Sequence, residues 1–153
     1  VDISQKAIEY LKNKNKNKKL KFINNDYLLL KSIKKFDLIV DRAAITCGND
    51  RDKIHKIINK INHDLNQTGK FVGIDWYSKN TQSYKNVRKE ESFITPSKGP
   101  LSNIGKLYFS NLSDVKKTLK IFNIISLNEK KVKNFLDKNY SLATWSFVCE
   151  KKK

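Results

Sequence analysis

The 153-residue sequence has little cysteine, proline or glycine and no methionine. Its two cysteines, Cys47 and Cys149, cannot build a disulfide framework or, on their own, a four-ligand zinc site. No apolar run approaches the roughly 18 residues that span a bilayer, and residues 1–6 lack the basic and apolar regions of a secretory signal. We therefore expect no metal, no membrane partner and a location in the reducing cytoplasm.

Acidic residues are also scarce, because 32 Lys and Arg residues stand against 15 Asp and Glu residues. The resulting formal net charge of +17 invites a nucleic-acid partner. Only three of the basic residues are arginines, the side chain that binds phosphates and base edges in a bidentate manner. The lysines are spread along the whole chain, and abundant Lys and Asn also follow from an A/T-rich coding sequence. We expect a solvated lysine-rich surface rather than a nucleic-acid interface.

Helical and extended patterns alternate along the chain. Apolar residues at helical spacing predict helices over 4–11, over 50–65 with Gly69 as the ending glycine, and from 113 onward. Short apolar runs predict strands over 1–3, 20–24, 36–40, 70–77, 122–127 and 141–149. The alternation favours a parallel sheet covered by helices. Little chain separates the last two strands, so we expect these to pair antiparallel.

A long polar segment, residues 78–105, follows the strand that ends at Tyr77. It contains Pro96, Gly99, Pro100 and Gly105. It exceeds the roughly 12–15 residues that are usual for a connection without secondary structure. The sequence therefore predicts a lid or substrate-binding insertion over 78–105.

Carboxylates stand at or near the ends of successive predicted strands. Asp2, Asp26 and Asp41 follow three of them directly, and Asp75 lies late in the next. In an open α/β sheet, ligands bind at the carboxyl ends of the strands, where such acids can accept hydrogen bonds from ribose hydroxyls or an adenine amino group. Each Asp could instead cap a turn. Three consecutive strands that end in Asp nevertheless favour a nucleoside site.

The motifs Asp2-Ile3-Ser4, Asn25-Asp26, Phe36-Asp37-Leu38-Ile39-Val40-Asp41-Arg42-Ala43-Ala44 and Gly69-Lys70-Phe71 occur in a recognisable order. In order and spacing they resemble class I S-adenosylmethionine-dependent methyltransferases of the small-molecule type, and the Asp-Arg-Ala-Ala turn is similar to that of thiopurine-methyltransferase-like enzymes. The resemblance covers residues 1 to about 77. It implies a Rossmann-like α/β sheet, mostly parallel with an antiparallel final strand, and helices on both faces.

The resemblance also implies a cofactor, S-adenosylmethionine, and roles for residues in its site. Asp2 would accept the two ribose hydroxyls, and Ile3 would pack on the adenine. Asp26 would accept the adenine amino group, and the amide of Tyr27 would meet a ring nitrogen.

The methionine end and the transferred methyl group would lie against Asp41, Arg42 and Ala43. Arg42 could instead pair with Asp41 or meet a substrate carboxylate. Asp75, Trp76 and Tyr77 are candidates for the acceptor pocket, and the two aromatic residues could equally be core.

One feature of the family is missing, because no Gly-x-Gly occurs in the sequence. The family's first strand and its glycine-rich turn would lie before Asp2. We therefore expect residues 1–153 to form a single, N-terminally incomplete methyltransferase domain that lacks one wall of the cofactor site. Such a sheet would have unpaired strand edges, which predicts self-association.

The predicted function is S-adenosylmethionine-dependent methyl transfer, a transferase reaction, to a small-molecule acceptor. The protein would mainly position the reactants, so no metal or catalytic triad is needed. One alternative is an RNA methyltransferase that uses the high positive charge. Against it, Asp41-Arg42-Ala43-Ala44 replaces the Asn/Asp-Pro-Pro-aromatic turn of adenine methylases. The other alternative is an α/β interaction module without a cofactor.

Overall fold

The computed structural model describes residues 1–31, 34–85, 92–137 and 140–152. The chain divides into two units, residues 1–34 and residues 35–153. Each unit is described by itself.

The first unit is built around one amphipathic helix, α1 (Gln5–Lys14). Its N-cap is Ser4, whose Oγ accepts a hydrogen bond from the amide of Ala7 at 3.3 Å. The predicted strands at 1–3 and 20–24 are reduced to a single parallel bridge between Asp2 and Asn24. A short 3-10 helix, η1 (Tyr27–Leu29), follows this bridge. The helix over 4–11 is thus confirmed, and the two strands are present only as a bridge.

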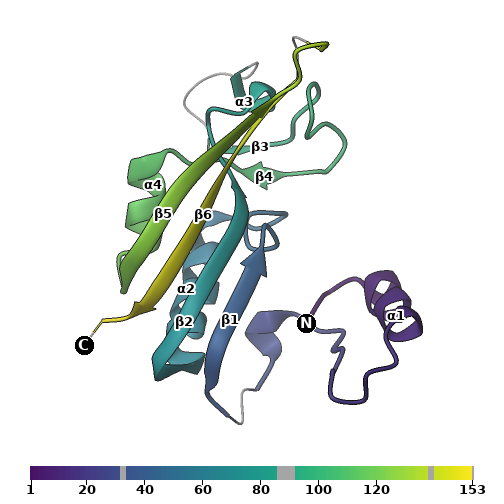
Figure 1. The fold of residues 1–153 in the computed structure, drawn as a ribbon, viewed down its shortest axis with the longest axis vertical. Helices are drawn as coiled ribbons and strands as arrows, with labels where there is room; N and C mark the ends of the chain where they lie inside the picture. The colour runs from purple at the N-terminus through teal and green to yellow at the C-terminus, as the bar shows by residue number, and fades with distance from the viewer. Residues whose placement is uncertain (32–33, 86–91, 138–139, 153) are drawn as a thin grey trace. The chain divides into compact units, whose positions relative to one another are not determined.

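The second unit contains a four-stranded mixed sheet (Figure 1). Its elements are β1 (Phe36–Arg42), α2 (Arg51–Asp64), β2 (Leu65–Tyr77), α3 (Gln82–Lys85), β3 (Phe93–Ile94), β4 (Leu107–Tyr108), α4 (Leu112–Thr118), β5 (Phe122–Lys133) and β6 (Ser141–Lys151). The strand order is β1-β2-β6-β5. A separate two-stranded sheet pairs β3 with β4.

The prediction of a mostly parallel sheet is wrong. Among the described strands of this sheet, only β1 and β2 pair in parallel, and β6 runs antiparallel to both of its neighbours. The reason is the short connection from β5 to β6, which permits only an antiparallel hairpin. Strand β6 then lies between β2 and β5 and reverses direction against each. The predicted antiparallel pairing of the last two strands is confirmed.

The crossover between the parallel strands is α2, which starts where the sequence indicates. Asp50 is its N-cap and accepts from the amide of Lys53 at 2.7 Å. The helix ends at Asp64, so the prediction that Gly69 ends it is wrong. Gly69 lies inside β2, where a Cβ atom would come within 2.8 Å of the carbonyl oxygen of Phe36. This glycine permits the close approach of the two parallel strands.

The main core lies between the sheet and the helices. Phe147 packs edge-on against Phe71 and Trp76, with ring centroids 5.3 and 4.8 Å away. Its ring occupies the space over Gly73, where a Cβ would lie 2.1 Å from a ring carbon. The apolar stripe of α2, with Ile54 and its neighbours fully buried, completes this core.

Helices on both faces of the sheet were predicted, and the second unit departs from this. In Figure 1, α2 and α4 lie on the same side of the sheet, because both helical connections cross that face. The opposite face carries alternating apolar residues that stay partly or largely exposed: Leu38, Val40, Val72, Ile74 and Val148. Among the described residues of this unit, no helix covers them.

The segment 78–105 is folded, in the part that the structure describes, rather than an open loop. It contributes α3 and β3, and its Tyr84, Ile94 and Leu101 are buried. These side chains form a second apolar cluster with Tyr77, Leu107 and Phe109. The segment therefore packs directly on the end of β2. Residues 86–91 of the predicted lid lie outside the described residues.

Candidate functional site

The carboxyl ends of the two parallel strands meet at one edge of the sheet, where Asp41 is buried. One of its carboxylate oxygens accepts from the amide of Ile45 at 3.2 Å, and the other accepts from the indole nitrogen of Trp76 at 2.7 Å. Burial raises the pKa of Asp41, and the hydrogen bond from Trp76 opposes this rise. Asp41 thus ties the turn after β1 to the core of the sheet.

Two residues at this edge adopt the left-handed backbone conformation that favours glycine. They are Ala43, with φ 56°, and Asp75, with φ 60°. The amide of Ala43 donates to the carbonyl of Ile74 at 3.0 Å, so the two strained points lie on directly bonded strand ends. Such conformations cost roughly 1–3 kcal/mol each and gather at functional sites. Nothing in the sequence signals this strain, because neither position is a glycine.

Arg42 projects from the end of β1 and pairs with Asp75. Its Nε donates to a carboxylate oxygen of Asp75 at 3.0 Å, and the guanidinium side chain remains 78% exposed. The other oxygen of Asp75 lies 3.5 Å from the hydroxyl of Thr144 on β6. Of the two partners weighed from the sequence, Asp41 is not the one that Arg42 contacts. Thr144 was missed because no local pattern places β6 beside β2.

The two aromatic candidates for the acceptor pocket occupy different surroundings. Trp76 is fully buried in the main core. Tyr77 lies in the second cluster, and its hydroxyl is 3.7 Å from the sulfur of Cys47. Burial raises the pKa of both the Tyr77 phenol and the Cys47 thiol, so each is neutral at physiological pH. Cys47 is therefore a packed residue rather than an activated nucleophile.

The first unit repeats the local geometry of Asp41. One carboxylate oxygen of Asp2 accepts from the amide of Ser4 at 2.7 Å, and one of Asp26 accepts from that of Leu28 at 2.9 Å. The second oxygen of Asp2 has no hydrogen-bond partner among the described residues. Asp2 is exposed, and the candidate adenine contact Ile3 is 76% exposed.

Tyr27 is half-buried and begins η1 directly after Asp26. Asp2, Ile3, Asp26 and Tyr27 thus all belong to the first unit, whereas Asp41, Arg42 and Ala43 belong to the second.

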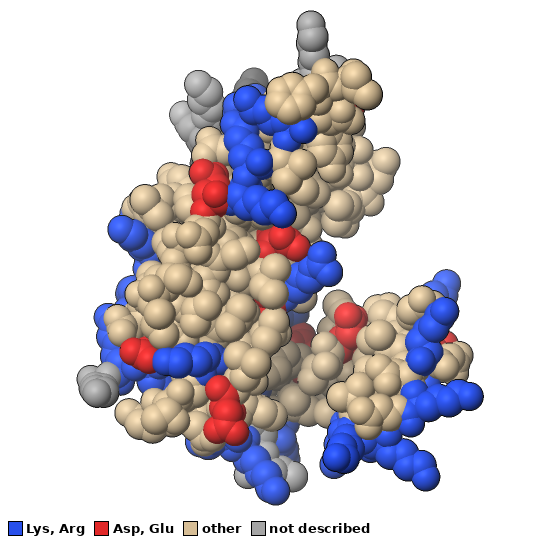
Figure 2. All heavy atoms as spheres, viewed as in Figure 1, with Lys and Arg blue, Asp and Glu red and all other residues tan. Residues whose placement is uncertain are grey.

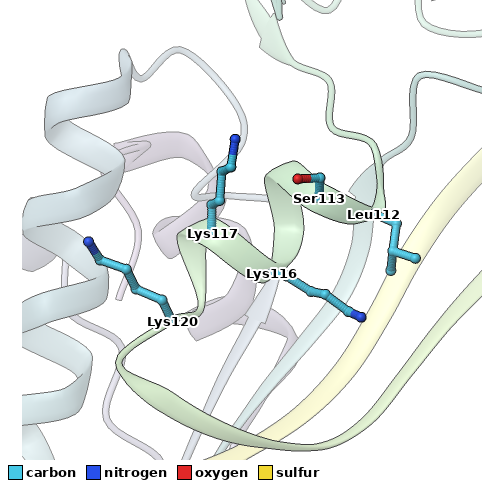
Figure 3. Close-up of a pocket in the computed structure, with 5 residues that line it drawn as sticks. All are labelled: Leu112, Ser113, Lys116, Lys117 and Lys120. Carbon is cyan, nitrogen blue, oxygen red and sulfur yellow. The ribbon is translucent and has the colours of Figure 1, made fainter.

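The part of the chain that the structure describes offers little other chemistry. It holds no group of three or more potential metal ligands and no helix long and apolar enough to cross a membrane. A shallow hollow beside α4 is lined by Leu112, Ser113, Lys116, Lys117 and Lys120. In Figure 3 the three lysine side chains point in different directions, so they do not converge on one anion.

No protein-family model matches the sequence, and no curated protein matches it significantly. Solved structures do match. A SAM-dependent methyltransferase from Methanosarcina mazei superposes with a TM-score of 0.73 and 15% identity, over 98% of this chain and 79% of that one. An S-adenosylmethionine-dependent methyltransferase from Clostridium acetobutylicum gives 0.65 and 19%, over 99% and 73%.

The N-methyltransferase NodS from Bradyrhizobium japonicum, solved with S-adenosyl-L-homocysteine, gives a TM-score of 0.65 at 12% identity, over 99% of this chain and 65% of that one. The chain therefore spans 65–79% of the length of these three neighbours. At such low identities the likeness concerns the fold. This chain has the α/β fold of S-adenosylmethionine-dependent methyltransferases, with a mixed sheet of four strands.

Proposed function

We propose that this protein transfers a methyl group from S-adenosylmethionine to a small-molecule acceptor in the cytoplasm. The observation that carries the proposal is the likeness to methyltransferases over 98–99% of the chain, together with acids at the strand ends. One of those acids, Asp2, has a carboxylate oxygen without a partner among the described residues. A carboxylate is a suitable acceptor for vicinal ribose hydroxyls, so the donor set fits an adenosine.

In the proposed site, the first unit binds the nucleoside. Asp2 accepts the ribose hydroxyls with the oxygen that Ser4 does not use, and Ile3 offers an exposed apolar side chain to the adenine. Asp26 accepts the adenine amino group, while the amide of Tyr27 donates to a ring nitrogen. The role of the local turns is to fix each carboxylate before the ligand arrives, which lowers the entropy cost of binding.

The second unit would supply the methionine end and the acceptor side. When bound, the cofactor supplies an electrophilic methyl group, and the protein orients the acceptor and excludes water. The turn at Ala43 is held by the carboxylate of Asp41 and by strained backbone. This fixed turn, with the Arg42–Asp75 pair beside it, forms a rigid wall at the edge of the sheet.

The segment 78–105 is proposed to set the choice of acceptor. It follows directly on Tyr77, and its described part packs around that residue through Tyr84 and Leu101. Because it leaves the sheet at the same edge as Asp75, side chains from it can line an acceptor pocket. Substitution of its exposed residues is a better test than deletion, since deletion would remove buried core side chains.

Calorimetric titration of S-adenosylhomocysteine and, separately, of a short RNA separates this proposal from its alternatives. We expect saturable binding of the nucleoside ligand that changes little with salt. RNA binding that is tighter and weakens steeply with salt would favour the RNA methyltransferase, because phosphate contacts release counterions. Absence of nucleoside binding by the protein expressed from its complete reading frame would favour the interaction module.

A further inference from the structure

The hairpin of β5 and β6 ends in two adjacent apolar residues that face solvent. Phe135 is 90% exposed and Leu136 is 99% exposed. Scattered exposed apolar side chains are common, but two neighbouring ones at the tip of an arm are unusual. In Figure 1 the paired strands run to the upper end of the view, and this tip lies beyond α3.

Hydrogen bonds order the turn that presents these side chains. The carboxamide oxygen of Asn134 accepts from the amides of Leu136 at 2.9 Å and Asp137 at 3.4 Å. The amide of Asn134 donates to the carbonyl of Tyr140 at 3.1 Å, and that of Tyr140 donates to the carbonyl of Asp137 at 2.9 Å. The turn therefore holds Phe135 and Leu136 outward through its own hydrogen bonds.

Lysines lie directly below the apolar tip. Lys130, Lys131 and Lys133 are all exposed at the end of β5, and Asp137 is the one acidic residue among 130–137. Figure 2 shows blue basic side chains close to this end of the view. An apolar tip above a basic collar matches the layers of an anionic membrane surface, where phosphates lie outside the acyl chains.

We propose that the tip of the β5–β6 hairpin docks the protein on anionic lipid surfaces, with Phe135 and Leu136 entering the interface and the lysines binding lipid phosphates. This departs from the expectation of no membrane partner, which was drawn from the absence of a spanning run. A peripheral contact requires no span. The proposal is independent of methyl transfer.

Other occupants fit the tip less well. Two side chains cannot supply the roughly 1,000 Å² that a stable protein interface buries. A second copy of a chain with charge +17 would be repelled. Single-stranded nucleic acid stacks on a series of aromatic rings, whereas this tip offers one ring beside an aliphatic side chain.

The test is co-sedimentation of the full chain with neutral phosphatidylcholine vesicles and with vesicles containing about one third phosphatidylglycerol. We expect binding to the anionic vesicles that is at least tenfold stronger than to the neutral ones and decreases with salt. The double variant Phe135→Ser, Leu136→Ser should lose at least tenfold. Both side chains are exposed, so the variant should fold, and circular dichroism checks this.

Matched controls separate the hairpin from general charge. Lys131→Glu with Lys133→Glu should reduce vesicle binding at least tenfold. Lys116→Glu with Lys117→Glu on α4 makes the same change of net charge on equally exposed lysines and should stay within threefold of the unchanged protein.

Equal losses from the two lysine pairs would overturn the proposal, because binding would then follow total charge alone. So would unchanged binding by the tip variant, or no binding of the unchanged protein to anionic vesicles. A tip variant that instead abolishes self-association of the pure protein, or its binding to a short RNA, would assign the tip to those partners and overturn the lipid assignment.

Discussion

Trp76 donates its indole N–H to the buried carboxylate of Asp41, and this contact makes a pH-dependent prediction. Because the folded-state pKa of Asp41 is raised, the stabilising contribution of its protonated form is present below pH 3.8 and is lost as pH rises through the folded value. Trp76→Phe removes a donor that favours the charged form, so the pKa rises further. We expect a loss of about 1–3 kcal/mol in the free energy of unfolding at neutral pH and a smaller loss near pH 4.

Trp145→Phe is the matched control for this measurement. Its indole nitrogen donates to the carbonyl of Ser110 at 3.0 Å, an acceptor that does not titrate. Urea unfolding should therefore give the same loss for this variant at both pH values. If the Trp76 and Trp145 variants show the same pH dependence, Asp41 does not titrate as described.

The individual site residues show how far residue types alone can be interpreted. The pattern of Asp2, Asp26 and Asp41 at strand ends predicted acids at these turns, and each does accept a backbone amide there. The partners of Arg42 and Asp41 were not predictable. They come from Asp75 and Trp76 on β2, and a pairing register between two strands has no signature in the sequence of one.

At the scale of elements, Gly73 is the position where β2 and β6 depend most closely on one another. A methyl group at Gly73 would lie 2.1–2.7 Å from ring carbons of Phe147. We expect Gly73→Ala to lower the free energy of unfolding by about 1–3 kcal/mol through overpacking. Phe147→Leu should cost stability alone and cost much less in the Gly73→Ala background, as a double-mutant cycle measures.

Gly48→Ala supplies the control for this cycle. Gly48 has φ 69°, and a methyl group added there would have no atom within 4 Å, so its cost arises from the backbone alone. Phe147→Leu should add to it without recovery. Additive losses for Gly73 and Phe147 would contradict the packing described for this core.

The elements themselves were largely predictable, since α2 and β1 follow from apolar periodicity and from the Asp50 cap. Their ends were less so. Strand β2 begins at Leu65, because Gly69 serves a close strand approach rather than a helix end. The position of β6 between β2 and β5 is set by packing of the whole sheet, and local patterns cannot reveal it.

At the scale of the whole molecule, β1 is the edge strand of the four-stranded sheet, and its Leu38 and Val40 are 55% and 53% exposed. An exposed apolar edge recruits other chains. We expect residues 1–153 alone to self-associate in sedimentation velocity runs, and Leu38→Lys with Val40→Lys to shift the protein toward monomer.

Two lysines placed elsewhere control for added charge. Ile104→Lys with Leu112→Lys replaces apolar residues that are 52% and 47% exposed. This variant should associate as the unchanged chain does. A compact monomer at all concentrations for the unchanged chain would contradict the description of β1 as an open edge.

The central claim is that acids at the strand ends bind S-adenosylmethionine, and calorimetry of Asp2 variants tests it most directly. The protein expressed from its complete reading frame should bind the ligand. Asp2→Ala should weaken binding by about 1–3 kcal/mol, whereas Asp2→Asn, which keeps an acceptor for the amide of Ser4, should recover part of that loss. Asp50→Ala, which removes the α2 cap, should leave affinity unchanged. Binding that is insensitive to Asp2, or equally sensitive to Asp50, would contradict the account.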